Sequence, residues 1–217
     1  RQCDIRAIDI IPRERSTEFT VIARGEKLGT VHLNIPGEYN VKNALASITV
    51  GLHLGIPFAT IAESLKEFGG VYRRFEIKGM KNDILIVDDY AHHPTELKSA
   101  LSAARSGWKD RRIVAVFQPH TYTRTRDFHK EFGLSFDDAD IVLITDVYAA
   151  REQKIEGISG ELIAQAAKNA GHRHVHYVPN LADIESKLRG LMQAGDLVIT
   201  LGAGDITKLS DRLLIAE

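Results

Sequence analysis

The stretch that decides the fold is ILIVDDYAHHPTELKSALSA, residues 84–103. Its first half is an apolar run rich in Ile and Val, which is typical of a strand buried on both faces. Its second half begins with Pro94, a residue suited to the first position of a helix, and continues with apolar side chains at helical spacing. A buried strand that passes at once into an amphipathic helix is the repeating unit of an α/β fold.

The same rhythm continues to the end of the chain. Apolar runs and amphipathic segments alternate five times. The runs are residues 84–89, 112–117, 140–147, 174–179 and 196–203, and the amphipathic segments are residues 95–106, 125–136, 159–170, 181–193 and 206–215. Short connections of this kind favour right-handed crossovers between parallel strands. We therefore expect a Rossmann-like, doubly wound, mostly parallel sheet whose first strand is residues 84–89.

The residues before this pattern have a different rhythm. Apolar and polar side chains alternate over residues 4–35 with Gly25-Glu26 in the middle, which predicts a small half-buried antiparallel hairpin. Two helical segments follow, NVKNALASITVGLHLGI and FATIAESLKEFGG, and the second is closed by two glycines. The change of rhythm near Tyr72 predicts two domains, residues 1–72 and 73–217.

Composition narrows the class of protein. There are 28 Lys and Arg residues against 29 Asp and Glu residues, and no basic run offers a surface for nucleic acid. No apolar stretch approaches the roughly 20 residues needed to span a membrane, and the first residues have no signal-peptide pattern. The single Cys3 suits a reducing compartment. We expect a cytoplasmic protein without nucleic-acid or membrane partners, and, because the chain starts at Arg1, a piece of a longer one. Its oligomeric state stays open.

Polar side chains gather where the first two strands of the predicted sheet end. Asp89, Tyr90 and His92 follow the first strand, and FQPHTYTRT, residues 117–125, places His120 and Arg124 after the second. Open α/β sheets bind ligands at the carboxyl ends of their strands. Arg suits a carboxylate or phosphate, and His can bind an anion or carry a proton. The alternative for Arg124 is a surface ion pair with Asp127 or Glu131.

Five motifs occur in a fixed order: GEYNVKNA, YRRF, VDDYAHHPTE, FQPHTYTRT and DVYAAREQKIEGISG. In this order they resemble the carboxyl half of the muramyl ligases, and among them the branch that joins L-alanine to UDP-N-acetylmuramate. The resemblance implies that residues 1–72 are the last part of a central ATPase domain. Residues 73–217 would be a complete carboxyl-terminal Rossmann-like domain.

The resemblance also implies an activity. Muramyl ligases form an amide bond at the expense of ATP through an acyl phosphate, with Mg²⁺, in cytoplasmic peptidoglycan precursor synthesis. The substrates implied here are UDP-N-acetylmuramate, L-alanine and ATP. The chain contains no GK[ST] phosphate loop and lacks a UDP-substrate domain. We therefore expect it to be inactive alone, with the metal ligands upstream and none in this chain.

The family's ATP contacts fall on four residues. Asn40 and Asn43 match asparagines near the adenine, Arg74 matches an arginine that reaches the phosphates, and Asp89 matches an acid near the ribose. The alternatives are a polar helix flank for the asparagines and a structural Arg–Asp pair for the other two.

The family's amino-acid pocket falls on Tyr90, His92, His120 and Arg124, with Arg124 and His120 on the alanine carboxylate. Arg74, His92 and His120 are the catalytic candidates. Thr121 departs from the family, because some relatives carry Arg at this position, so a second cationic contact is in doubt.

Other interpretations remain open. LGAGDI, residues 201–206, is either a substrate-side loop or a tight turn, and HRHVH, residues 172–176, is a solvated strand face or a metal site. The whole protein could instead be a ligase that recycles a murein tripeptide, although FQPHTYTRT favours a free amino acid. It could also be a nucleotide-binding module without chemistry. A metal-dependent hydrolase would use a set of acids and histidines, namely Asp88, Asp89, His92, His93 and His120.

Overall fold

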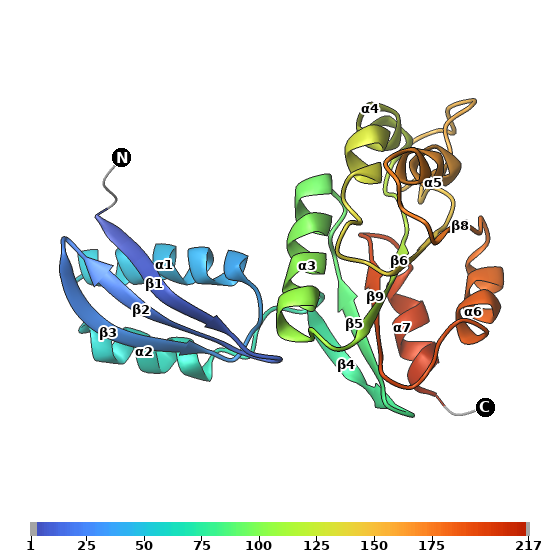
Figure 1. Cartoon of the computed structure of the whole chain (residues 1–217). Helices are drawn as coiled ribbons and strands as arrows, with labels where there is room; N and C mark the ends of the chain where they lie inside the picture. The colour runs from blue at the N-terminus through green and yellow to red at the C-terminus, as the bar shows by residue number, and fades with distance from the viewer. Residues whose placement is uncertain (1–3, 216–217) are drawn as a thin grey trace. The chain divides into compact units, whose positions relative to one another are not determined.

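The computed structural model describes residues 4–215 and divides into two compact units. The first comprises the residues up to Val71 together with Ser106–Lys109, and the second comprises the other residues from Tyr72 onward. The first unit is a three-stranded antiparallel sheet with two helices (Figure 1). Its strands are β1 (Ile5–Pro12), β2 (Thr17–Ala23) and β3 (Glu26–Leu33), and its helices are α1 (Glu38–His53) and α2 (Phe58–Glu67).

The core of this unit lies between the sheet and the two helices. Phe19 and Val31 from the sheet pack with Val41 and Ile48 of α1 and with Ile61 of α2. The predicted hairpin corresponds to β2 and β3, which join at Gly25 with a φ of 91°. The structure adds β1, which pairs with β2 in antiparallel register. We expected two strands here and the structure has three.

The second unit is built on a six-stranded sheet in the order β4-β5-β9-β6-β7-β8. The strands are β4 (Glu76–Lys81), β5 (Ile84–Asp89), β6 (Arg112–Phe117), β7 (Ile141–Ile144), β8 (Val175–Tyr177) and β9 (Asp196–Leu201). The helices are α3 (Pro94–Gly107), α4 (Tyr122–Gly133), α5 (Gly160–Asn169), α6 (Leu181–Arg189) and α7 (Thr207–Leu214). Every pair from β5 to β8 is parallel, which confirms the expected doubly wound α/β fold.

Helices cover both faces of this sheet (Figure 1). The chain moves outward along β5, β6, β7 and β8 and then returns to β9, so right-handed connections place α6 on the face opposite α3, α4 and α5. One buried cluster joins Ile184 of α6 and Leu209 of α7 to Val114 and Val116 of β6. On the other face, Phe117 packs against Phe132 and Phe136 at 5.2 and 5.9 Å between ring centroids.

The prediction that residues 84–89 form the first strand of this sheet was wrong. β4 precedes β5 and pairs with it in antiparallel register at the edge of the sheet. Its sequence, EIKGMK, has no apolar run because none of its side chains is fully buried. The turn that joins it to β5 has Asn82 and Asp83 at φ 52° and 58°, the two positive values of a type I′ hairpin turn.

Register sets the carboxyl ends of the central strands side by side. Leu201 at the end of β9 pairs with Asp89 of β5 on one side and with Phe117 of β6 on the other. The loop LGAGDI therefore begins between the two strand ends that carry the predicted site residues. Within residues 4–215, no helix has both the length and the apolar character needed to cross a membrane.

Candidate active site at the carboxyl edge of the sheet

The segment Arg73-Arg74-Phe75 is fastened to the end of β5 by its backbone. The N–H of Tyr90 donates to the carbonyl of Arg73 at 2.7 Å, and the N–H of Phe75 donates to Asp89 Oδ2 at 2.8 Å. Arg73 and Phe75 have φ angles of 57° and 49°, which L-residues seldom adopt. The position from which Arg74 leaves the backbone is therefore fixed by the strand end.

The two neighbouring arginines have different surroundings. Arg73 is buried, and its Nε donates to Asp88 Oδ2 at 2.8 Å. The side chain of Arg74 is 45% exposed, with Nη1 at 3.7 Å from Glu96 Oε1 and the guanidinium 5.7 Å from the ring centroid of Tyr90. A structural Arg–Asp pair is thus present, but it joins Arg73 to Asp88. Arg74 keeps a charge that an anionic ligand can reach.

Asp89 is almost fully buried at the end of β5. Besides Phe75, its carboxylate accepts a hydrogen bond from the N–H of Ala91, at 2.7 Å from Oδ1. Burial raises the pKa of Asp89 from 3.8 to about 6, although the two backbone N–H groups act in the opposite direction. Each carboxylate oxygen has a second lone pair, so a ligand hydroxyl can still donate to this group.

Glu96, in the first turn of α3, was not among the predicted site residues. Its Oε2 accepts the N–H of His92 at 2.9 Å and that of His93 at 3.2 Å, which satisfies two N–H groups at the start of the helix. Burial alone raises the pKa of Glu96, but these N–H groups and the charges of His92 and Arg74 outweigh it and leave the pKa below its usual value. The sequence signal is a glutamate three residues after the residue that precedes the helix.

Four aromatic rings form a row along the carboxyl edge. Tyr90 and His92 lie 5.3 Å apart between ring centroids, His92 and His120 lie 5.8 Å apart, and His120 stacks on Tyr148 at 5.8 Å with 19° between the planes. Three of these residues were predicted at the site, and the structure brings them together. Tyr148, which follows β7, was missed. Its position within DVYAAREQKIEGISG was the available signal.

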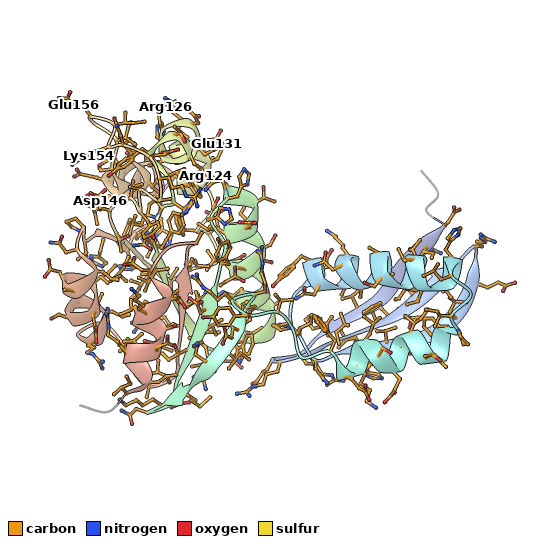
Figure 2. The ribbon with its side chains drawn as sticks, turned by 180° about the vertical axis from the view of Figure 1, so that it is seen from behind. Arg124, Arg126, Glu131, Asp146, Lys154 and Glu156 are labelled. Carbon is orange, nitrogen blue, oxygen red and sulfur yellow. The ribbon has the colours of Figure 1, made fainter. Side chains whose placement is uncertain are left out.

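Arg124, on the first turn of α4, turns toward His120. Its Nη1 lies 3.2 Å from His120 Nδ1 and donates to the carbonyl of His120 at 3.2 Å. Asp127, an alternative partner, pairs instead with Arg126 at 2.7 Å. Arg124, Arg126 and Glu131 are marked on α4 in Figure 2, with Lys154 and Glu156 on the neighbouring loop. Burial and the charge of Arg124 lower the pKa of His120, which favours the neutral imidazole.

The start of α4 is held by the loop that follows β7. Glu152 accepts hydrogen bonds from the N–H of Thr123, at 3.0 Å, and from its hydroxyl. Thr121 donates its N–H to the carbonyl of Tyr148 at 2.9 Å. Thr121 has φ 69° and ψ 141°, a conformation that a β-branched residue rarely adopts. Thr121 is therefore a strained position at the entry to α4.

Asn40 and Asn43 lie on α1 of the first unit. Asn40 Nδ2 donates to the carbonyl of Pro36 at 2.7 Å, and Asn43 Nδ2 lies 3.5 Å from Asn40 Oδ1. The two amides are thus neighbours on one helix face, and Asn43 is exposed.

The candidates for a metal site have other partners. The carboxylates of Asp88 and Asp89 are engaged by Arg73 and by backbone N–H groups. His172 Nε2 lies 2.9 Å from the carbonyl of Ala139. In the part of the chain that the structure describes, no three His, Cys, Asp or Glu side chains cluster as metal ligands.

Residues 73–204 match the family described as Mur ligase, glutamate ligase domain. The chain belongs to the Mur ligase family. The match begins at the buried Arg73 and ends inside the loop after β9, so it includes the whole carboxyl edge described above.

Curated Mur ligases similar to this chain include two called UDP-N-acetylmuramate–L-alanine ligase. The protein of Salinibacter ruber is 49% identical over 97% of this chain and 44% of its own length. The protein of Trichlorobacter lovleyi is 46% identical over 98% of this chain and 47% of its own length. The chain thus spans less than half the length of these relatives.

Solved structures of Mur ligases have the same fold. The UDP-N-acetylmuramate–alanine ligase of Thermotoga maritima is 28% identical, with a TM-score of 0.82 over 99% of this chain and 46% of that one. A murein peptide ligase of Psychrobacter arcticus is also 28% identical, with a TM-score of 0.66 over 98% of this chain and 44% of that one.

Proposed function

We propose that this chain is the carboxyl-terminal part of an ATP-dependent ligase that joins L-alanine to UDP-N-acetylmuramate through an acyl phosphate, in the cytoplasmic stage of peptidoglycan synthesis. The observation that carries the proposal is the cluster of Tyr90, His92, His120 and Arg124 in a chain 49% identical to an alanine ligase. Residues 1–72 would end the ATPase domain, and residues 73–217 would be the amino-acid-side domain.

Each unit has residues suited to contact a nucleotide. Two neighbouring amides, Asn40 and Asn43, can donate to and accept from an adenine edge, and the exposed Arg74 offers charge to phosphate. Asp89 keeps lone pairs for a ribose hydroxyl. ATP with Mg²⁺ supplies the phosphoryl group that turns a carboxylate into a reactive acyl phosphate. Ligands for Mg²⁺ are expected in the part of the relatives that this chain does not span.

The amino-acid side has groups for both ends of alanine. The fork of Arg124 matches a carboxylate. His120 Nδ1 accepts from Arg124, so its proton lies on Nε2, which can donate to the same carboxylate. Tyr90 limits the space near the methyl group.

His92 has the opposite tautomer. Its Nδ1 lies 2.9 Å from the carbonyl of Tyr90 and 3.3 Å from Glu96 Oε2, so Nδ1 carries the proton. Nε2 then has a free lone pair and can take the proton that the ammonium group must lose before it attacks. Arg74 stabilises the negative oxygens in the preceding step, in which the acyl phosphate forms.

The complete protein tests this function. It is incubated with ATP, Mg²⁺ and UDP-N-acetylmuramate, and with either L-alanine or a murein tripeptide, and the products are identified by mass spectrometry. We expect the amide with L-alanine, formed together with ADP. An amide formed only with the tripeptide would assign the protein to the branch that recycles a murein tripeptide. Nucleotide binding without either amide would leave a module without chemistry.

A further inference from the structure

Arg73 is the centre of a buried network that the proposed function does not use. Besides the ion pair with Asp88, its Nη2 donates to the carbonyl of Gly202 at 2.6 Å, and its Nη1 lies 3.4 Å from the carbonyl of Gly204. Asp88 is itself held by the hydroxyls of Thr200 and Thr207, at 2.6 and 2.9 Å. One guanidinium thus connects the segment before β4 to both ends of a loop distant in sequence.

The loop that Arg73 holds lies between the two halves of the proposed site. The N–H of Gly202 donates to the carbonyl of Asp89 at 3.1 Å, on the side of the ATP contacts. On the other side, Gln118 Oε1 accepts the N–H of Ile206 at 3.1 Å. Between these two hydrogen bonds, the guanidinium of Arg73 contacts the carbonyls of Gly202 and Gly204.

Gly204 lies against Tyr148, so the position of the loop affects the residues proposed to bind the amino acid. A Cβ added at Gly204 would lie 2.7 Å from Cγ of Tyr148 and 2.4 Å from Gln118 Oε1, so the backbone supports the Tyr148 ring directly. Tyr148 in turn stacks on His120. A displacement of Gly204 therefore moves the surface against which the His120 ring rests.

A buried ion pair of this kind is not required for stability alone. Removing two charges from water costs about as much as their attraction returns, and apolar replacements are often neutral. The planar guanidinium of Arg73, in contrast, fixes the direction of several hydrogen bonds at once. The network is thus better suited to holding one loop conformation than to stabilising the fold.

We propose that Arg73 is a positioning residue for the amino-acid side of the site, acting through the Gly202–Gly204 loop and Tyr148 on His120. This inference rests on the proposed function. It assigns the two arginines of YRRF to different halves of the reaction, with Arg74 toward ATP and Arg73 toward the amino acid.

Loss of the Arg73 side chain should weaken amino-acid binding and leave ATP binding unchanged. Arg74 is held by backbone contacts of Arg73 and Phe75 with Tyr90 and Asp89, and none of these uses the Arg73 side chain. Loss of the guanidinium should therefore leave the ATP contacts in place and release the loop.

The chain offers a matched control at the opposite end of the strands. Arg112 donates to the fully buried Asp196 at 2.9 and 2.8 Å and to the carbonyl of Leu191 at 2.8 Å. To avoid an unpaired buried charge, the two variants are Arg73→Met with Asp88→Asn, and Arg112→Met with Asp196→Asn. Arg73→Lys tests partial rescue, since Lys keeps the charge without the fork.

In the complete enzyme, we expect the Arg73→Met, Asp88→Asn variant to raise the KM for L-alanine roughly ten- to a hundredfold, the range that small misplacements of a binding group produce. The KM for ATP should stay within about twofold, and Arg73→Lys should fall between the two values. The Arg112→Met, Asp196→Asn variant should change neither constant.

Hydrogen exchange read by mass spectrometry gives a second readout that does not depend on catalysis. The peptide that contains residues 201–206 should exchange faster in the Arg73 variant than in the Arg112 variant. If both variants lose stability alike and neither changes the KM for alanine or the exchange of this peptide, Arg73 is merely structural and the inference is wrong. If the wild-type protein forms no amide, the proposed function fails, while the exchange still decides whether Arg73 holds the loop.

Discussion

Neighbouring side chains of the same chemical type have different surroundings in this protein. Asp88 is buried in an ion pair with Arg73, whereas Asp89 is buried against backbone N–H groups and has a raised pKa. Arg73 is buried and Arg74 is exposed. The motif resemblance indicated Arg74 and Asp89 as site residues. It did not indicate the role of Arg73, because the hydrogen bonds of Arg73 with Gly202 and Gly204 join residues that are far apart in sequence.

The raised pKa of Asp89 predicts a pH dependence of folding. Because its pKa is about 6 in the folded chain against an ordinary 3.8, the folded state holds this proton more tightly than the unfolded state. Its contribution to stability is therefore fully present below about pH 4 and is lost as the pH rises through 6. The loss amounts to about 3 kcal/mol, at 1.36 kcal/mol per pKa unit.

Urea unfolding of the wild type and of Asp89→Asn between pH 4 and pH 7 measures this contribution. The Asn side chain does not titrate, so subtracting its curve removes the effect of the other carboxylates. The stability of the wild type relative to this variant should fall as the pH rises. A difference that stays constant over this range would show that Asp89 titrates near its ordinary value.

Arg74 has a predicted role in acyl phosphate formation. In the complete enzyme, Arg74→Ala should slow this step about a hundredfold or more, because one fixed charge near the reacting phosphate is lost. Alanine binding should change little, since the Arg124 contacts are on the other side of the site. Rapid-quench measurement of acyl phosphate at saturating ATP tests this. Turnover equal to the wild type would exclude the role.

At the scale of secondary structure, the sequence predicted strands that are buried on both faces and missed a strand that is not. The five apolar runs all correspond to strands, from β5 to β9. We did not predict β4, because its sequence, EIKGMK, forms a strand at the edge of the sheet and contains no apolar run. The Asn82-Asp83 turn was the only local signal for it.

The order of the strands in the sheet could not be predicted from the sequence either. The apolar runs of β5 and β6 follow one another in the sequence, but β9 lies between these two strands in the sheet. A local pattern does not contain the register of strands that are far apart in the chain. This is why the position of LGAGDI between the two halves of the site, and the contact of Gly204 with Tyr148, emerged only from the structure.

The entry to α4 offers a test of strain. Thr121→Gly should stabilise the protein by about 1 kcal/mol, because glycine adopts φ 69° without strain of about 1–3 kcal/mol and loses about 1 kcal/mol of chain entropy. Thr95→Gly, within the first turn of α3, is the control and should destabilise by about 0.3 kcal/mol, the difference between the helix propensities of Thr and Gly. Thermal unfolding of both variants decides the point. Equal destabilisation by the two changes would rule out strain at Thr121.

At the scale of the whole molecule, the chain carries one side of the proposed reaction. It has no GK[ST] phosphate loop, and it spans less than half of its curated relatives. The residues proposed for the amino acid all lie at the carboxyl edge of the sheet of the second unit, on the segments that follow β5 and β6 and on the first turn of α4. The central claim is therefore that this edge handles the amino acid, while phosphates are held mainly elsewhere in the complete protein.

The most direct test of this claim is steady-state kinetics of Arg124→Lys in the complete enzyme, with each substrate varied in turn. Lys keeps the charge but loses the two parallel hydrogen bonds of the fork. A contact of this kind contributes about 1.5–3 kcal/mol, which at about 1.4 kcal/mol per tenfold change predicts a KM for L-alanine roughly ten- to a hundredfold higher. Arg126→Lys, next to Asp127 on the exposed side of α4, is the control.

The account predicts that the KM values for ATP and UDP-N-acetylmuramate stay within about twofold in the Arg124 variant. All three KM values should stay within about twofold in the Arg126 variant, because Arg126 is not among the residues proposed to bind a substrate and its exposed ion pair with Asp127 contributes little. An increase confined to ATP would contradict the account, because Arg124 would then belong to the nucleotide side.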